Sequence, residues 1–289
     1  MNDQKTPEWV FRSVEKIKPN SLTVEVIADY SGGSMLDHAF NEVHQHFRRF
    51  DKKNLIHELL THPVHAFSTI ETGFWIAQMA FHSEHPNLVI FSNTAPRGDI
   101  AWNGERKQAF VYALLDNGVP VFAVDAGYNL SFIKDRIVGL WEVKVTNTGT
   151  QFRSRDQYPE GTIEILYGNE EFVGRKLSIS DIPDVPAFAV ASVDGYGNIK
   201  TTIRRSELTD SVRKAKYVRI TLNGTSQFTL NSINGEKQGK VGDLCMVVGS
   251  SGGKKNPFIE FIKLQREADQ EFHIIGPKDD LSRIQLESA

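Results

Sequence analysis

One short segment combines a carboxylate, an aromatic ring and a carboxamide. Asp194, Tyr196 and Asn198 alternate with Gly195 and Gly197, and the glycines supply the positive backbone dihedral angles that a tight reversal needs. Together the three side chains offer acceptors, a donor and a stacking surface to a small polar ligand. The segment fits a ligand clamp. It also fits a plain hairpin turn whose Asp and Asn bond their own backbone.

Two glycine-rich loops have the composition of binding loops. The sequence at 31–34 is Ser-Gly-Gly-Ser, which could cradle a phosphate but lacks a dinucleotide fingerprint and a Walker lysine. The sequence at 250–253, Ser-Ser-Gly-Gly, can present hydroxyls and backbone amides to a carboxylate. A tight turn at the first and a flexible surface loop at the second are the alternatives.

The histidines do not have the spacing of a metal site. His44 and His46 are two residues apart and would point to different faces of a helix. His62 and His65 are three apart, but Pro63 interrupts any helix there. The sequence therefore predicts no metal site.

The elements that must position these residues alternate in the amino half. We expect strands at Leu22–Ala28, Asn54–Leu60, Leu88–Phe91, Phe110–Leu115 and Val121–Ala123, and helices at Leu36–Phe50 and Ser68–His82. Ser34 and Ser68 are the expected N-caps. This alternation favours an α/β sandwich domain with a central, mostly parallel sheet.

The prolines of Asp181–Pro186 indicate a linker between two domains. Beyond it, short β-type runs such as Val190–Val193 and Ile199–Ile203 alternate with Gly and Asn turns. We expect an α/β domain at 1–180 and a small antiparallel β-barrel domain at 181–289.

Composition limits the function without naming it. The 289 residues are 40% hydrophobic, enough for a sizeable core, and the net charge of −3 argues against nucleic acid or an anionic membrane as partner. The single Cys245 lies in an apolar run, which predicts a packed strand residue. The sequence has no apolar stretch of about 18 residues and no leader at Met1–Asn20, so we expect a soluble cytoplasmic protein.

The order of these segments resembles the superfamily of S-adenosylmethionine hydroxide adenosyltransferases (SAM hydrolases) and the related fluorinases and chlorinases. After the turn at 194–198 come Ile-Thr-Leu-Asn-Gly at 220–224 and a strand at 241–252 that ends in Ser-Ser-Gly, in the family's order. The first strand ends in Asp29, where family members carry a ribose-binding Asp. The resemblance covers about Ser21 to Asp280 and is better in the carboxy half.

The resemblance implies an activity and an assembly. Family members bind S-adenosylmethionine without a cofactor and replace its sulfonium at the ribose C5′, here with water as nucleophile, to give adenosine and L-methionine. They are homotrimers with a pocket between subunits. Two alternatives stay open: a non-catalytic protein that binds S-adenosylmethionine or adenosine, and an unrelated carbohydrate- or nucleotide-binding protein.

The resemblance also implies substrate-binding residues. Asp29 would accept both ribose hydroxyls and Phe67 would wall the ribose, while Asp125 would be structural. In the carboxy half, Asp194 would pair with the methionine ammonium, Tyr196 would stack on the adenine face and Asn198 would bind the adenine edge. The methionine carboxylate would bind Ser250 and Ser251.

The chain departs from the hydrolytic members at the water-activating residues. Those members carry an Asp-Pro-Gly segment after the third strand, then an arginine, and a histidine elsewhere. Here residues 92–98 read Ser-Asn-Thr-Ala-Pro-Arg-Gly, with Thr94 in place of the Asp, and a threonine cannot serve as a base near neutral pH. Thr94, Arg97 and Arg106 are the catalytic candidates, and no histidine matches. A halide-binding loop is not recognisable either.

Overall fold

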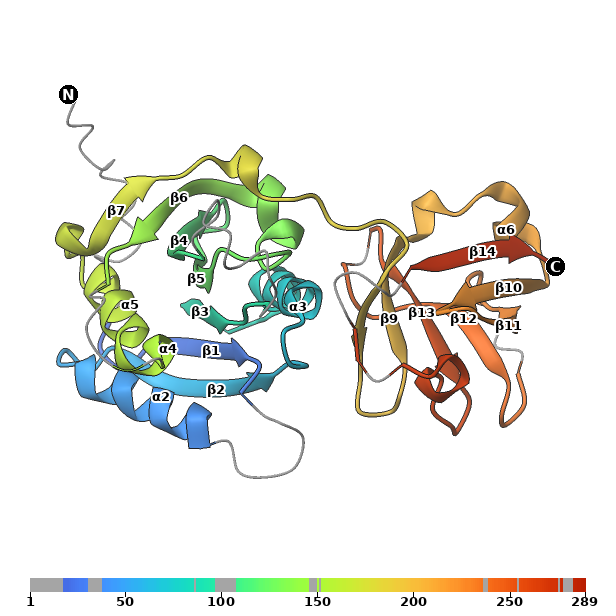
Figure 1. Ribbon diagram of the computed structural model, residues 1–289, viewed down its shortest axis with the longest axis horizontal. Coiled ribbons are helices and arrows are strands. Elements are labelled where there is room, and N and C mark those ends of the chain that lie inside the picture. Colours follow the sequence, from blue (N-terminus) through green and yellow to red (C-terminus); the bar gives the residue numbers. More distant parts are fainter. Residues whose placement is uncertain are drawn as a thin grey trace. The chain divides into compact units, whose positions relative to one another are not determined.

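The computed structural model describes residues 18–30, 38–85, 87–96, 108–145, 150, 152–235, 239–253, 255–274, 276–277 and 283–289. The chain divides into two compact units, Met1–Asp184 (unit 1) and Val185–Ala289 (unit 2) (Figure 1). The division lies inside the proline-containing segment Asp181–Pro186, a little beyond the boundary expected after residue 180.

Unit 1 contains a seven-stranded sheet. Its strands, in spatial order, are β2 (Ile56–Pro63), β1 (Leu22–Ala28), β3 (Leu88–Asn93), β5 (Pro120–Val124), β4 (Phe110–Leu115), β6 (Ile137–Val143) and β7 (Val173–Lys176). The pairs β2/β1, β1/β3 and β3/β5 are parallel, whereas β5/β4, β4/β6 and β6/β7 are antiparallel.

The expected mostly parallel sheet is therefore corrected to a mixed one. The physical reason is the tight turn between β4 and β5, where Leu115 and Val119 share a backbone hydrogen bond of 3.1 Å and Gly118 has a φ of 85°. A short hairpin of this kind can join only antiparallel strands. The Asn117-Gly118 pair is the sequence signal for it.

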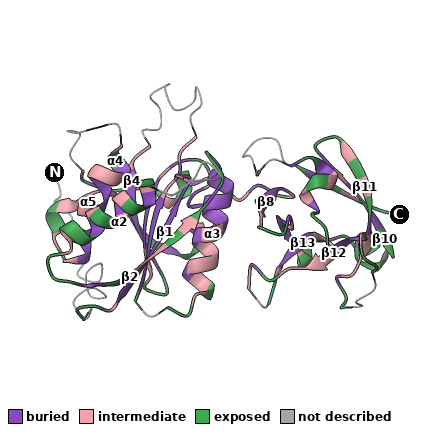
Figure 2. Ribbon diagram, turned by 90° about the horizontal axis from the view of Figure 1, so that it is seen from below, coloured by how far each residue is buried: buried purple, intermediate pink, exposed green. Residues whose placement is uncertain are grey.

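Helices cover both faces of this sheet. On one face lie α2 (His38–Phe50), α4 (Arg153–Asp156) and α5 (Tyr158–Leu166), and on the other α3 (Thr69–His82) and the 3-10 helix η2 (Ser131–Arg136). Successive strand residues point to the two layers in turn, since Val26 belongs to the same core cluster as Phe47 of α2 and Ile27 to the same core cluster as Ile76 of α3. The strands are accordingly buried between partly exposed helices (Figure 2).

Several local expectations are confirmed. The strands expected at Leu22–Ala28 and Phe110–Leu115 have those bounds, and Ser68 caps α3 by accepting a hydrogen bond of 3.3 Å from the Glu71 amide. The helix expected at Leu36–Phe50 is described from His38 onward. Its expected cap, Ser34, lies outside the described residues.

Unit 2 contains a second seven-stranded sheet, curled into a half-barrel. Its order is β14 (Ile284–Ser288), β10 (Tyr217–Leu222), β11 (Thr225–Asn231), β12 (Leu244–Val248), β13 (Phe258–Lys263), β9 (Ile199–Arg204) and β8 (Val190–Val193). An isolated bridge pairs Ala189 with Arg283, the residues just before β8 and β14. The core of unit 2 includes Ile220, Met246 and Phe261.

The expected antiparallel barrel is thus found only in part. All neighbouring pairs in this sheet are antiparallel except β11 and β12, which are parallel. Residues 232–243 connect these two strands, a connection long enough to cross over. Cys245 is buried in β12, as its apolar neighbours predict.

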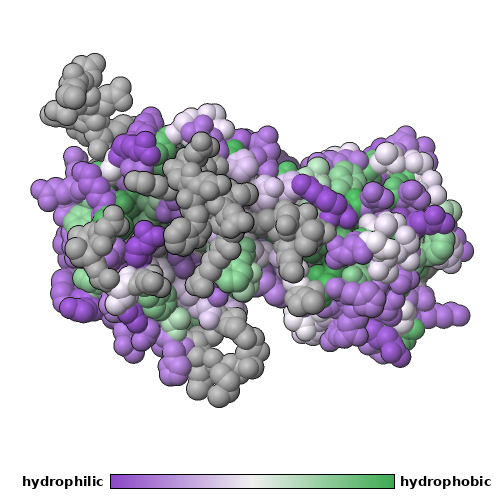
Figure 3. Space-filling view, in the orientation of Figure 1, coloured by the Kyte–Doolittle hydropathy of each residue, from purple (hydrophilic) through white to green (hydrophobic). Residues whose placement is uncertain are grey.

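The remaining elements are short. They are α6 (Asp210–Lys214) and the 3-10 helices η3 (Glu170–Phe172), η4 (Ile179–Asp181), η5 (Arg205–Glu207) and η6 (Asp269–Phe272). None of the helices in the described part of the chain is long and apolar enough to span a membrane. On the face drawn in Figure 3 the described surface mixes polar with apolar residues, in line with the interspersed charges of the sequence.

Candidate functional site

A pocket of about 370 Å³ lies in unit 1 at the carboxyl ends of the parallel strands. Asp29 directly follows β1, Asn93 ends β3 and Val124 ends β5, and all three line it. Ligands of open α/β sheets bind at this end of the strands. The other polar side chains of the wall belong to Gln108, Arg153 and Ser154, and the aromatic ones to Tyr30, Phe67, Phe152 and Tyr158.

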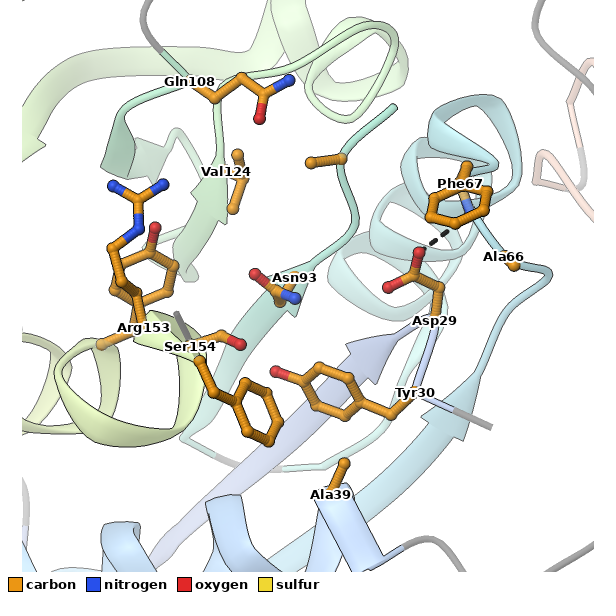
Figure 4. Close-up of a pocket in the computed structure, with 13 residues that line it drawn as sticks. Asp29, Tyr30, Ala39, Ala66, Phe67, Asn93, Gln108, Val124, Arg153 and Ser154 are labelled. Carbon is orange, nitrogen blue, oxygen red and sulfur yellow. Dashed lines mark hydrogen bonds between the residues drawn. The ribbon is translucent and has the colours of Figure 1, made fainter. Parts of the chain in front are cut away.

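Asp29 and Phe67 hold each other in place. The Phe67 amide donates a hydrogen bond of 2.9 Å to Oδ2 of Asp29 (Figure 4). Phe67 has a φ of 64°, uncommon for an aromatic residue, and the residue is 46% exposed. Strained backbone of this kind occurs at ligand-binding positions. The structure therefore brings these two expected site residues to one side of the same pocket.

Tyr30 lies between the two sides of the pocket. Its hydroxyl is buried and points toward the space between Asn93 and Ser154 (Figure 4). Its ring packs edge-on against Phe152 at 5.5 Å and Phe40 at 5.0 Å. Burial raises the pKa of Tyr30 well above its usual range, so the phenol stays protonated and can donate a hydrogen bond.

The side of the pocket opposite Asp29 is formed by α4 and the residues around it. Arg153 lies there with Gln108, whose amide donates to the Pro96 carbonyl at 3.3 Å (Figure 4). The Tyr158 ring, which also lines the pocket, stacks on Phe110, with centroids 4.0 Å apart. Sequence reasoning missed Tyr30, Asn93 and Arg153, because nothing in their local pattern marks them and only the fold brings them to Asp29.

Thr94 is placed away from the pocket. Its side chain is fully buried, and its hydroxyl accepts a hydrogen bond of 2.9 Å from the Thr72 hydroxyl of α3. Asn93 and Ala95 on either side line the pocket instead, as the alternation of an extended chain dictates. Arg97 and Arg106, the other catalytic candidates, lie outside the described residues.

In unit 2 the turn from Asp194 to Asn198 is a self-bonded hairpin turn. Oδ1 of Asp194 accepts from the amides of Tyr196 at 3.0 Å and Asn198 at 3.1 Å, and its Oδ2 accepts from the Asn198 side chain at 3.1 Å. Burial would raise the pKa of Asp194, but these hydrogen bonds and the charge of Lys200 lower it. Tyr196 is 80% exposed, so the rigid turn presents its ring to solvent.

The Ser-Ser-Gly loop is held in place, contrary to the alternative of a flexible surface loop. The Ser251 hydroxyl, which is buried, donates to Glu260 Oε1 at 3.2 Å, and the Ser250 amide donates to the same oxygen at 3.1 Å. Arg204 donates to the Gly252 carbonyl at 2.9 Å. Gly252 has a φ of 82°, which favours glycine.

A buried lysine connects the turn and the loop. Lys200 Nζ lies 3.2 Å from Glu260 Oε1 and 3.6 Å from Asp194 Oδ2, and the side chains of Lys200 and Glu260 are each 8% exposed. Lys200 and Glu260 face each other across β9 and β13. Sequence reasoning missed both, although a Lys and a Glu inside apolar strands are a signal for a buried pair. With two carboxylates and one ammonium, this network has a net negative charge.

The expected site residues thus form two groups, one in each unit. Asp29 and Phe67 belong to unit 1, and the Asp194 turn and the Ser-Ser-Gly loop belong to unit 2. In the parts of the chain that the structure describes, no group of three or more His, Cys, Asp or Glu residues is arranged to hold a metal ion.

Comparisons with known proteins identify the fold. No protein-family model and no curated protein matches the chain. Among solved structures, an uncharacterized conserved protein from Thermotoga maritima matches with a TM-score of 0.67 and 16% identity, over 91% of this chain and 100% of its own. A conserved hypothetical protein from Thermus thermophilus matches with a TM-score of 0.61 and 12% identity, over 92% of this chain and 99% of its own. The chain shares with these proteins a mixed α/β fold.

Proposed function

We propose that the protein binds S-adenosylmethionine or a related adenosyl compound in the pocket of unit 1. The observation that carries this proposal is Asp29, fixed by the Phe67 amide on the wall of a pocket of about 370 Å³. A carboxylate offers two acceptor oxygens to a ribose diol, and the surrounding aromatic faces suit a nucleoside. Pockets for small ligands have volumes of roughly 300 to 1,000 Å³.

Two features of unit 2 suit a ligand that carries a positive charge and an aromatic base. The network of Asp194, Lys200 and Glu260 has an excess negative charge, which the ammonium of a methionine moiety would balance. The exposed ring of Tyr196 offers a stacking face to adenine. By resemblance, the two groups of residues would meet in a homotrimer, with each pocket shared between neighbouring subunits.

The proposed reaction is substitution at the ribose C5′, with water as nucleophile and methionine as leaving group. The C5′–oxygen bond forms as the C5′–sulfur bond breaks, the sulfonium leaves as the neutral thioether of methionine, and one proton of the attacking water is released to solvent. A neutral leaving group of this kind does not need a metal ion. The protein would hold the C5′–sulfur bond and the attacking water in line and exclude other water.

A second candidate function is adenosyl binding without turnover. The observation that favours it is Thr94, because its hydroxyl is buried and bonded to Thr72 instead of facing the pocket. A pocket that keeps its binding residues but lacks a base at this position would bind the ligand and release it unchanged.

One experiment tests the proposal and separates the two candidates. Purified protein is incubated with S-adenosylmethionine, adenosine and methionine are followed by chromatography, and the thermal midpoint is measured with and without ligand. We expect a raised midpoint, since ligand at about 100 times its dissociation constant adds about 2.7 kcal/mol, and at most weak hydrolysis. If no adenosyl compound raises the midpoint at millimolar concentration, the proposed site is wrong. Robust turnover rules out the binding-only candidate.

A further inference from the structure

The pocket of unit 1 has a cation that no carboxylate of the described chain neutralises. The short helix α4 carries two arginines. Arg155 is paired with Asp156 at 2.6 Å and with Glu42 at 3.2 Å. Arg153 is exposed, lines the pocket, and makes no side-chain hydrogen bond or ion pair with any described residue. The two neighbouring arginines therefore differ in what balances their charge.

The nearby carboxylate is already committed to other partners. Asp156 accepts hydrogen bonds from Arg155 and from the Thr150 hydroxyl, and these lower the pKa of Asp156 to about 2. The charge of Asp156 is therefore neutralised by Arg155. Among the described residues no carboxylate supplies a counter-charge for Arg153, which leaves its guanidinium available to an anionic ligand.

The surroundings of Arg153 favour a ligand with an oxyanion. Asp29 and Phe67 lie on one side of the pocket and Arg153 lies on the other, with Tyr30 and Asn93 between them (Figure 4). A guanidinium binds the planar face of a carboxylate or two oxygens of a phosphate through parallel hydrogen bonds. Burial raises the pKa of Tyr158, which also lines the pocket, and the charge of Arg153 partly opposes this rise.

We propose that Arg153 forms a subsite for an oxyanion, and that the ligand is a nucleoside bearing a phosphate or carboxylate at the end opposite Asp29. The nucleoside part rests on the proposed function, while the oxyanion part rests on Arg153 alone. The Ser-Ser-Gly loop, which the resemblance assigns to the carboxylate, donates its Ser251 hydroxyl and Ser250 amide to Glu260 instead. Arg153 gives such a carboxylate a cationic partner.

The test is calorimetric titration of the full chain with adenosine, adenosine 5′-monophosphate and S-adenosylmethionine. For the unmodified protein we expect one of the two charged ligands to bind about tenfold or more tightly than adenosine. Arg153→Gln should remove the advantage of the monophosphate over adenosine and leave adenosine unchanged. It should reduce the advantage of S-adenosylmethionine only in part, because the ammonium of that ligand is assigned to the network of Asp194. Arg153→Lys should keep part of the affinity that Arg153→Gln loses. The monophosphate tests a phosphate and S-adenosylmethionine tests a carboxylate. The matched control is Arg175→Gln, since Arg175 is an exposed arginine of unit 1 that pairs with Glu142 and lies outside the pocket lining.

The outcomes separate this inference from the proposed function. If adenosine binds but neither charged ligand binds more tightly, or Arg153→Gln leaves the difference undiminished, the oxyanion subsite is wrong and the adenosyl proposal stands. If no adenosyl compound binds but inorganic phosphate raises the thermal midpoint of the unmodified protein and not of Arg153→Gln, the oxyanion subsite stands and the adenosyl proposal is wrong. If neither phosphate nor any adenosyl compound binds, both are wrong. Ligand-free thermal midpoints of the variants verify that they fold.

Discussion

Asp29 does two things at once in this fold. It places a carboxylate at the carboxyl end of β1, and it accepts the amide hydrogen bond that fixes Phe67 at a φ of 64°. A charge and a backbone acceptor are separable by substitution, because Asn keeps an acceptor oxygen while Ala keeps neither. The pair of variants therefore distinguishes the proposed ligand-binding role of Asp29 from its structural role.

We expect Asp29→Asn to retain the fold and to bind adenosine about tenfold or more weakly, since one amide oxygen cannot accept from both ribose hydroxyls as a carboxylate does. Asp29→Ala should lose the same affinity and also about 1 kcal/mol of unfolding free energy, because the Phe67 amide loses its acceptor. Calorimetry and urea unfolding measure the two effects. Unchanged adenosine affinity in both variants would reject the role given to Asp29.

Lys200 is the second residue whose environment makes a sharp prediction. Replacing it with Met leaves Glu260 buried without its cation, for which the expected cost is about 3 to 5 kcal/mol of unfolding free energy. The double variant Lys200→Met with Glu260→Gln should recover part of that loss. Urea unfolding of the four proteins forms a double-mutant cycle. A cycle with no coupling would show that the pair contributes nothing specific.

The connection between β2 and α3 contains a histidine that is bonded to a glutamate. His65 lies between β2 and α3, and its Nδ1 is 2.8 Å from Oε2 of Glu71 in the first turn of α3. The same oxygen accepts the His65 amide at 2.7 Å. The hydrogen bond to Glu71 raises the pKa of His65, and partial burial opposes it. This contact ties the start of α3 to the chain that leads to Phe67.

The pH dependence of stability follows from that raised pKa. Because the folded protein holds the His65 proton more tightly than the unfolded chain, the protonated histidine stabilises the fold at pH values below the pKa of the unfolded chain, about 6.5. This stabilisation is lost as the pH rises through the higher pKa of His65 in the folded protein. Unfolding free energies measured across this range should fall with rising pH relative to those of Glu71→Gln. Parallel profiles for the two proteins would contradict the assignment.

How far the elements could be predicted depends on how local their causes are. Leu22–Ala28 and Phe110–Leu115 are continuous apolar runs, so their strands follow from the sequence itself. The direction of each strand is set by its connections, and the hairpin at Asn117-Gly118 made the sheet mixed. The register of β9 and β13 places Lys200 opposite Glu260, two residues about 60 positions apart in the sequence, and no local pattern encodes this pairing.

The site shows the same division between local and long-range causes. The turn at Asp194 could be singled out because it is a contiguous pattern, whereas Asp29 was expected in the site only from the family resemblance. Arg153 reaches the pocket from a helix distant in sequence, so only the fold identifies it. Thr94 was expected in the site, but strand alternation turned its side chain toward Thr72.

For the whole molecule, the proposed shared pocket makes assembly a condition of binding. The chain has a mass of 32.5 kDa, and light scattering should report about three times that value. Dilution that dissociates the assembly should also release the ligand. A stable monomer that binds adenosine with unchanged affinity would contradict the shared pocket.

The strand order of unit 2 has a consequence for how the chain folds. β8 and β9 come first along the unit, but β9 pairs with β13, and Ala189 beside β8 pairs with Arg283 just before the last strand. Such long loops must close before the pairings stabilise anything, which slows folding relative to a meander of sequential hairpins. Until β13 is made, Lys200 stays hydrated and the β9 edge remains open to other chains. Refolding of unit 2 is therefore expected to be slow, and its yield to fall as protein concentration rises.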